Sequence, residues 1–175
     1  HGAPASALSL TQGTECGTIY SVDELSAICA TAHKAGLSVH MDGARFSNAV
    51  ASAGVSPAEL SWKAGVDVLC FGGTKNGCMA AEAVVFFDPA KAKDFEFMRK
   101  RAGHLWSKMR FISAQFGVYF EDDLWLTLAS RANAMAQRLA AGLKDIPGVS
   151  LLYPVDINEL FVVFPDGVAE KLHAD

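Results

Sequence analysis

A glycine-rich turn that holds a lysine follows an apolar run: residues 70–79 read CFGGTKNGCM, with Lys75 in the middle. Surface lysines usually lie on polar helix faces, whereas Lys75 has Phe71 before it and Met79 after it. A phosphate loop is one interpretation, but the pattern GxxxxGK[ST] places its hydroxyl residue after the lysine, and here Thr74 precedes it. A Schiff-base lysine fits better, because apolar flanks remove water and leave some of the amine neutral and nucleophilic.

A second charged cluster precedes this turn in the sequence, where Asp42 and Arg45 follow a predicted strand. Pyridoxal phosphate, the common carbonyl partner of such lysines, needs a carboxylate on its pyridinium nitrogen so that the ring stays protonated and accepts electrons. Asp42 fits that role, and the planar fork of Arg45 fits the phenolate oxygen of the ring or a substrate carboxylate. Taken alone, Asp42 and Arg45 are more simply a local ion pair at a strand end, and Lys75 is more simply a solvated turn lysine. Together, each at a strand end, they favour a cofactor site.

Composition excludes several classes of protein. The 175 residues are 51% hydrophobic and 19% charged, which indicates a folded domain with a real core. The formal charge of −4 argues against nucleic acid or an anionic membrane as partner, and no apolar run reaches the length of a bilayer span. The 4 cysteines and 5 histidines show no metal-site spacing, so we expect no metal, reduced thiols and a cytoplasmic protein.

Alternating strand and helix patterns are expected to position the charged clusters. Strands are predicted at residues 7–10, 37–41, 66–71 and 83–87, and helices at about 22–34, 57–64, 89–102 and 104–144. Capping boxes at Ser21 to Glu24 and at Ser56 to Glu59 mark two of the helix starts. This order predicts an α/β fold with a mostly parallel sheet, in which ligands gather at the carboxyl ends of the strands.

The last part of the chain reads as a separate unit. Pro147 and Gly148 break the helical pattern, and two further strands are predicted at 149–155 and 160–164. Residues 167–175 look like the first turns of a helix. Because the chain also lacks an initiator methionine, we expect a fragment of a longer protein.

The motifs HMDGARFSNAVA, GVDVLCFGGTKNG and EAVVFF together resemble the low-specificity L-threonine aldolase family. The stretches LSLTQGTECGTIYSVDELSAI and GHLWSKMRFISAQF are also similar to that family, so the resemblance runs from about Leu8 to the end. It implies a fold-type-I pyridoxal-phosphate enzyme, with residues 1–146 as part of the cofactor-binding large domain and 147–175 as the beginning of a small α+β domain. It also implies a homodimer or a homotetramer.

The resemblance implies catalytic roles for three residues. Lys75 matches the lysine that bonds to the cofactor, Asp42 the aspartate on the pyridine nitrogen, and Arg45 the arginine near the phenolate oxygen and the substrate carboxylate. The implied reaction is retro-aldol cleavage of L-threonine, L-allo-threonine and related β-hydroxy-α-amino acids to glycine and an aldehyde. The alternatives are another amino-acid lyase of this fold, either β-eliminating or acting on phenylserine, or an inactive fragment.

Three further residues are implied in cofactor binding. Ala44 matches the small residue beneath the ring, Thr74 the hydroxyl residue before the lysine, and Arg110 an arginine that reaches the phosphate. Many members carry glycines before that arginine, where this chain has residues 106–109, WSKM. The resemblance places the phosphate-binding turn and a ring-stacking histidine before His1, and a further substrate arginine after Asp175.

Two histidines have open interpretations. Period-two alternation puts His40 on the same strand face as Asp42, either as its hydrogen-bond partner or as a satisfied core histidine. His104 precedes the segment of Arg110 and is either a solvent-exposed loop residue or a residue at the mouth of the site.

Overall fold

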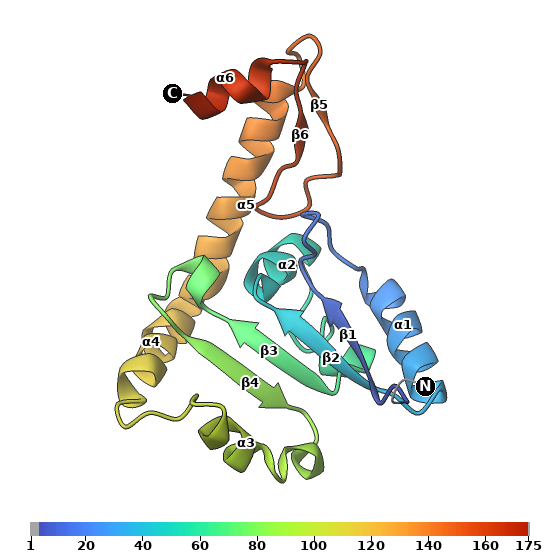
Figure 1. Ribbon diagram of the computed structural model, residues 1–175, viewed down its shortest axis with the longest axis vertical. Helices are drawn as coiled ribbons and strands as arrows, with labels where there is room; N and C mark the ends of the chain where they lie inside the picture. The colour runs from blue at the N-terminus through green and yellow to red at the C-terminus, as the bar shows by residue number, and fades with distance from the viewer. Residues whose placement is uncertain (1–3, 175) are drawn as a thin grey trace.

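The computed structural model describes residues 4–174 and has a four-stranded sheet in the order β1-β2-β3-β4 (Figure 1). The strands are β1 (Ala7–Thr11), β2 (Ser38–Gly43), β3 (Val68–Gly72) and β4 (Glu82–Phe86). The first three are parallel and β4 runs antiparallel to β3. The prediction of an α/β fold with a mostly parallel sheet is therefore confirmed.

Local sequence signals alone determine the start of α1 (Val22–Lys34). The Ser21 hydroxyl accepts a hydrogen bond from the Glu24 amide, and the Glu24 carboxylate accepts one from the Ser21 amide, as the capping box predicted. Leu25 and Cys29 form the buried face of the helix.

The sequence analysis missed one helix, α2 (Phe46–Ala53). Its first residue follows Arg45, whose side chain makes no capping hydrogen bond, so the usual start signal is absent. A missing cap costs about 1 kcal/mol, whereas burying Phe46 and Val50 contributes about 1.5–3 kcal/mol each. Tertiary burial therefore forms this helix. The helix ends at Gly54, which has a left-handed backbone at φ 66°, and a glycine at this position is a signal of a helix end that the sequence does contain.

The helix predicted at 57–64 is wrong. Ser56 and Glu59 do form their reciprocal hydrogen bonds, but only turns follow, and then the 3₁₀ helix η1 (Trp62–Ala64). The backbone of Ser61, at φ −141° and ψ −105°, leaves the helical region and stops propagation.

The two long helices predicted after β4 are interrupted. The first consists of η3 (Pro89–Ala92) and α3 (Phe95–Arg101), and the second of α4 (Arg110–Phe120), η4 (Glu121–Asp123) and α5 (Leu124–Leu143). Asp122 and Asp123 separate α4 from α5 with φ angles of 48° and 54°, a left-handed conformation that aspartate tolerates better than most residues.

The small second sheet lies beside α5, away from the first sheet (Figure 1). Its strands, β5 (Ser150–Leu151) and β6 (Val162–Val163), are antiparallel and shorter than predicted. Ala140 of α5 and Val155 belong to the core that joins this unit to the helix. The predicted final helix is present as α6 (Val168–Ala174), whereas Asp175 lies outside the described residues.

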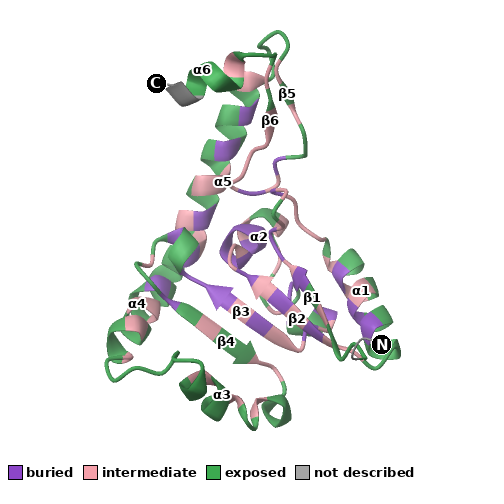
Figure 2. Cartoon of the chain, in the orientation of Figure 1, coloured by how far each residue is buried: buried purple, intermediate pink, exposed green. Residues whose placement is uncertain are grey.

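The main core is formed by one face of the first sheet together with α1 and α2 (Figure 2). Val39, Met41 and Leu69 point into it and are at most 5% exposed. His40 and Asp42 alternate with them and lie on the opposite, half-buried face. Within residues 4–174, no helix is both long and apolar enough to cross a lipid bilayer.

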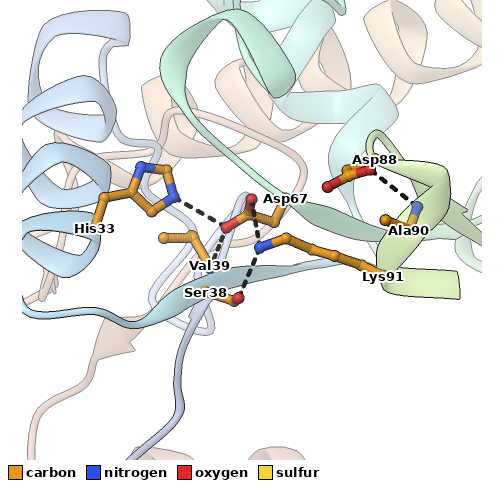
Figure 3. A network of polar contacts seen from close by, with 7 residues as sticks. All are labelled: His33, Ser38, Val39, Asp67, Asp88, Ala90 and Lys91. Atoms are coloured by element: carbon orange, nitrogen blue, oxygen red, sulfur yellow. Dashed lines mark hydrogen bonds and ion pairs between the residues drawn. The ribbon is translucent and has the colours of Figure 1, made fainter.

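A network of charged and polar residues links α1, β2 and η3 at the amino-terminal ends of the parallel strands (Figure 3). Asp67, just before β3, meets His33 Nε2 and Lys91 Nζ at 2.9 Å each and accepts the Val39 amide at 2.7 Å. Lys91 also donates to the Ser38 hydroxyl. Burial raises the pKa of Asp67, but these hydrogen bonds and the Lys91 charge outweigh it and lower that pKa to about 2.

Candidate active site

The carboxyl edge of the first sheet gathers the predicted catalytic residues. Asp42 is the penultimate residue of β2, whereas the sequence analysis had placed it after the strand. It lies opposite Thr11 of β1 and Cys70 of β3. Lys75 lies in the 3₁₀ turn η2 (Thr74–Asn76), just past the end of β3. Both clusters therefore lie at the same edge, as the parallel strands predicted.

A glycine brings the two clusters into contact. A Cβ atom on Gly72, at the end of β3, would lie only 2.9 Å from the Cα atom of Ala44 and 2.9 Å from Glu82 Oε2. Real Cβ atoms essentially never approach a neighbour this closely, so a side chain at position 72 would push the two strand ends apart. The segment 42–45 thus lies against the start of the Lys75 turn.

Asp42 has one carboxylate oxygen occupied within the protein. Its Oδ1 accepts the Ala44 amide at 2.9 Å, and among residues 4–174 its second oxygen accepts no hydrogen bond. The side chain is half-buried. Burial, followed by the negative charges of Asp42 and Glu82, raises the pKa of the Cys70 thiol. This region is therefore negative and suited to a protonated, cationic nitrogen.

His40 lies on the same strand face as Asp42 but shares no hydrogen bond with it. Its Nδ1 is 2.8 Å from Ser9 Oγ and its Nε2 is 3.2 Å from Cys70 Sγ, so its ring bridges β1 and β3. Of the two interpretations offered, the geometry supports a histidine satisfied by neighbouring strands.

Arg45 precedes α2 and forms an ion pair with Glu159. Both side chains are about one-fifth exposed, at 19% and 22%. The simpler interpretation, a local ion pair between Arg45 and Asp42, is therefore wrong. The sequence analysis missed Glu159, which lies with Asp156 in the segment before β6 and has no local motif that marks it.

Lys75 is exposed, which contradicts the expectation that its apolar flanks desolvate it. Met79, just beyond the turn, is 90% exposed. Within the described residues, the Lys75 amine makes no hydrogen bond and no ion pair, so it is free to react with a carbonyl group. Thr74 instead stabilises the turn, since its hydroxyl accepts the Ala81 amide at 3.2 Å.

A cleft of about 1050 Å³ opens beside the turn, between β4, α3 and α4. Thr74 and Glu82 line it, and so does His104, which favours the interpretation of that histidine as a residue near the site. The sequence analysis missed Glu82. Only the antiparallel pairing of β4 with β3 places Glu82 opposite Gly72 and so beside the site.

The structure does not join Arg110 to the other predicted residues. Arg110 is exposed at the start of α4, with its guanidinium 4.9 Å from the centre of the Phe111 ring. Among residues 4–174 it forms no hydrogen bond or ion pair with the rest of the predicted site. Met109 and Ser113 on either side of it line the cleft that begins at Thr74. Its role in phosphate binding stays a prediction.

Comparisons with known proteins agree with this geometry. Residues 1–166 match the model of the β-eliminating lyase family. The chain is 54% identical over 167 residues to a low specificity L-threonine aldolase of Pseudomonas aeruginosa, and 52% identical over 165 residues to one of another Pseudomonas strain. These alignments cover 95% and 94% of the chain but 48% of each relative, so the chain spans about half their length.

A solved structure of threonine aldolase from Leishmania major has the same arrangement. It superimposes with a TM-score of 0.89 at 30% sequence identity, covering 97% of this chain and 49% of that one.

Proposed function

Because the chain belongs to the β-eliminating lyase family, we propose that it carries part of the active site of a pyridoxal-phosphate-dependent threonine aldolase. The substrates would be L-threonine, L-allo-threonine and related β-hydroxy-α-amino acids, and the products glycine and an aldehyde. One observation carries the proposal: Asp42, Arg45 and Lys75 converge at one sheet edge, where Ala44 lies against Gly72. The names of the Pseudomonas relatives support the choice of substrate.

The residues present suit this cofactor. Asp42 keeps one carboxylate oxygen free of protein hydrogen bonds within residues 4–174, as a partner for a protonated ring nitrogen requires. Lys75 offers an amine that is not committed to any described residue. Ala44 and Gly72, in contact at the ends of β2 and β3, hold the Asp42 segment and the Lys75 turn next to each other.

When bound, pyridoxal phosphate supplies an electron sink for the electron pair of the breaking Cα–Cβ bond of the substrate. Asp42 would hold a proton at the ring nitrogen, and Lys75 Nζ would be the amine that binds the carbonyl group of the cofactor. Arg45 orients a carboxylate or the phenolate oxygen with its planar fork. The reaction needs no oxidant or reductant, because the β-hydroxyl group loses one proton and Cα gains one.

We extend the proposal to the organisation of the protein. Residues 1–146 would belong to the large domain and 147–175 would begin the small one, in a cytoplasmic homodimer or homotetramer. The free thiols of the cysteines suit a reducing compartment. Exposed apolar side chains near the Lys75 turn suit a subunit contact, among them Met79 at 90%, Phe111 at 59% and Val118 at 60% exposure.

Product analysis tests the proposed reaction. Purified gene product supplied with pyridoxal phosphate and L-threonine is expected to form glycine and acetaldehyde in equal amounts. Ammonia and a keto acid would instead indicate β-elimination, the reaction after which the matched family is named. Lys75→Ala should abolish product formation, whereas Lys144→Ala, at an exposed lysine after α5, should leave it unchanged. An unaltered rate in Lys75→Ala would overturn the proposal.

A further inference from the structure

The residue after Lys75 is buried although the turn around it is exposed. Asn76 is 7% exposed, whereas Lys75 and Gly77 on either side face solvent. Its Nδ2 group donates to Tyr119 Oη at 2.6 Å and to the Trp125 carbonyl at 2.8 Å. One amide group thus uses both of its N–H donors to tie the turn to α4 and α5.

The same chain of hydrogen bonds continues to the helix that follows Arg45. Tyr119 Oη lies 3.0 Å from Ser47 Oγ, and these two residues are 3% and 1% exposed. Ser47 is the second residue of α2, and Arg45 is the residue from which that helix starts. Asn76, Tyr119 and Ser47 therefore connect the Lys75 turn to the Arg45 segment through the protein interior.

Tyr119 acts here as a neutral link. Burial raises the pKa of its phenol, and the hydrogen bonds with Ser47 and Asn76, which lower it, do not offset that effect. A phenol that keeps its proton can accept the Asn76 N–H and still donate to Ser47. It is therefore suited to holding positions and not to exchanging protons.

Backbone hydrogen bonds close the turn on itself and join it to Ala81, because the Gly73 carbonyl accepts the Asn76 and Cys78 amides and the Gly73 amide donates to the Ala81 carbonyl. Gly73 precedes it and Gly77, at φ 113°, follows it, so the backbone on both sides is permissive. Apart from the contact of Thr74 with the Ala81 amide, the side-chain anchor of this turn within the described residues is Asn76. Its directional bonds fix the register of the turn against two helices.

We propose that the buried chain Asn76–Tyr119–Ser47 positions Lys75 relative to Arg45, so that both address the same bound molecule. This inference rests on the proposed function, because it assigns these residues to the site that holds the cofactor. Displacing a reacting group by about 1 Å can cost about 10²-fold in rate. Loosening the chain should therefore affect catalysis and the protonation of lysine-bound cofactor more than it affects substrate binding.

The chain offers a matched control in a second, half-buried amide contact. Asn133 Nδ2 donates to the Asn48 carbonyl at 3.0 Å, and its Oδ1 accepts from Asn48 Nδ2 at 3.0 Å. This contact joins α5 to α2, whereas the proposed chain reaches α2 from α4, and it does not include the Lys75 turn. Asn133→Ala should lower stability without altering the site.

The experiment compares Asn76→Ala, Tyr119→Phe and Asn133→Ala in the purified gene product loaded with pyridoxal phosphate. The readouts are kcat, KM for L-threonine, and the pH midpoint of the visible absorbance of lysine-bound cofactor. For Asn76→Ala and Tyr119→Phe we expect kcat to fall about 10-fold to 10²-fold with KM nearly unchanged. We also expect the midpoint to move by about 0.5 pH unit or more, with no such changes in Asn133→Ala.

Each outcome decides the inference. Unchanged kcat and midpoint in Tyr119→Phe would overturn it, even if Asn76→Ala failed to fold. Equal changes in Asn133→Ala would also overturn it, because they would indicate general loosening. A wild-type protein that forms no lysine-bound cofactor would refute the proposed function itself, and the inference with it.

Discussion

At the scale of single residues, Arg45 depends on a partner that lies far away in the sequence. Glu159 belongs to the segment between β5 and β6, yet its carboxylate pairs with Arg45 at the edge of the first sheet. The second oxygen of Glu159 is buried and makes no hydrogen bond within the described residues. This carboxylate is held in place chiefly by Arg45, and it in turn fixes the direction of the guanidinium fork.

Glu159→Gln is predicted to destabilise the protein, because it leaves a largely buried guanidinium without a charged partner. The free energy of unfolding should fall by about 1–3 kcal/mol, between the values typical of exposed and of buried pairs. Urea denaturation measures this change. Glu96→Gln, at an exposed residue of α3, is the control and should stay within about 0.5 kcal/mol of wild type. Equal stability of both variants would contradict the assigned role of Glu159.

The sequence was sufficient to predict where Asp42 and Lys75 lie, because strand ends and glycine turns are local features. It was not sufficient for Glu159, whose contact with Arg45 exists only after the second unit has packed beside α5. Nor did it show that Lys75 is exposed, since apolar neighbours in a sequence need not enclose a residue in space. The roles of the six predicted site residues stay predictions.

At the scale of secondary-structure elements, the elements with local signals were predicted best. The helix α1 starts at its capping box and ends before a left-handed Gly36, as its sequence indicates. The helix α2 has no such start signal and forms because its residues are buried. The break at Asp122 and Asp123 interrupts the stretch 104–144, whose helix-favouring residues continue on both sides of it.

Asp67 links three of these elements and makes their stability depend on pH. Its pKa is about 2 in the folded protein, below the unfolded value of about 3.9. A lowered pKa stabilises the fold above the unfolded pKa, and this stabilisation is lost as the pH falls from about 4 towards 2. The contribution near neutral pH is roughly 2–3 kcal/mol.

Asp67→Asn is therefore predicted to lower the free energy of unfolding by roughly 2–3 kcal/mol near neutral pH, with the difference from wild type shrinking towards about pH 2. Urea denaturation of both proteins across this range measures it. Asp94→Asn, at an exposed aspartate before α3 that makes no capping hydrogen bond, should show no such trend. A difference that persists undiminished at the lowest pH would show that Asp67 acts through something other than its charge.

At the scale of the whole molecule, the candidate site combines residues of the first sheet with a residue of the small second unit. The first sheet supplies Asp42 and the Lys75 turn, and the segment before β6 supplies Glu159. The α/β class was predictable from the alternation of strands and helices. The cleft beside Thr74 was not, because it depends on how α3 and α4 pack against the antiparallel β4.

The most direct measurement reduces the purified gene product with borohydride in the presence of pyridoxal phosphate and maps the labelled peptide by mass. The account predicts a pyridoxyl adduct on the peptide that contains Lys75, and no adduct there in Lys75→Ala. An adduct confined to another lysine, or none in wild-type protein that retains the cofactor, would contradict the assignment of Lys75.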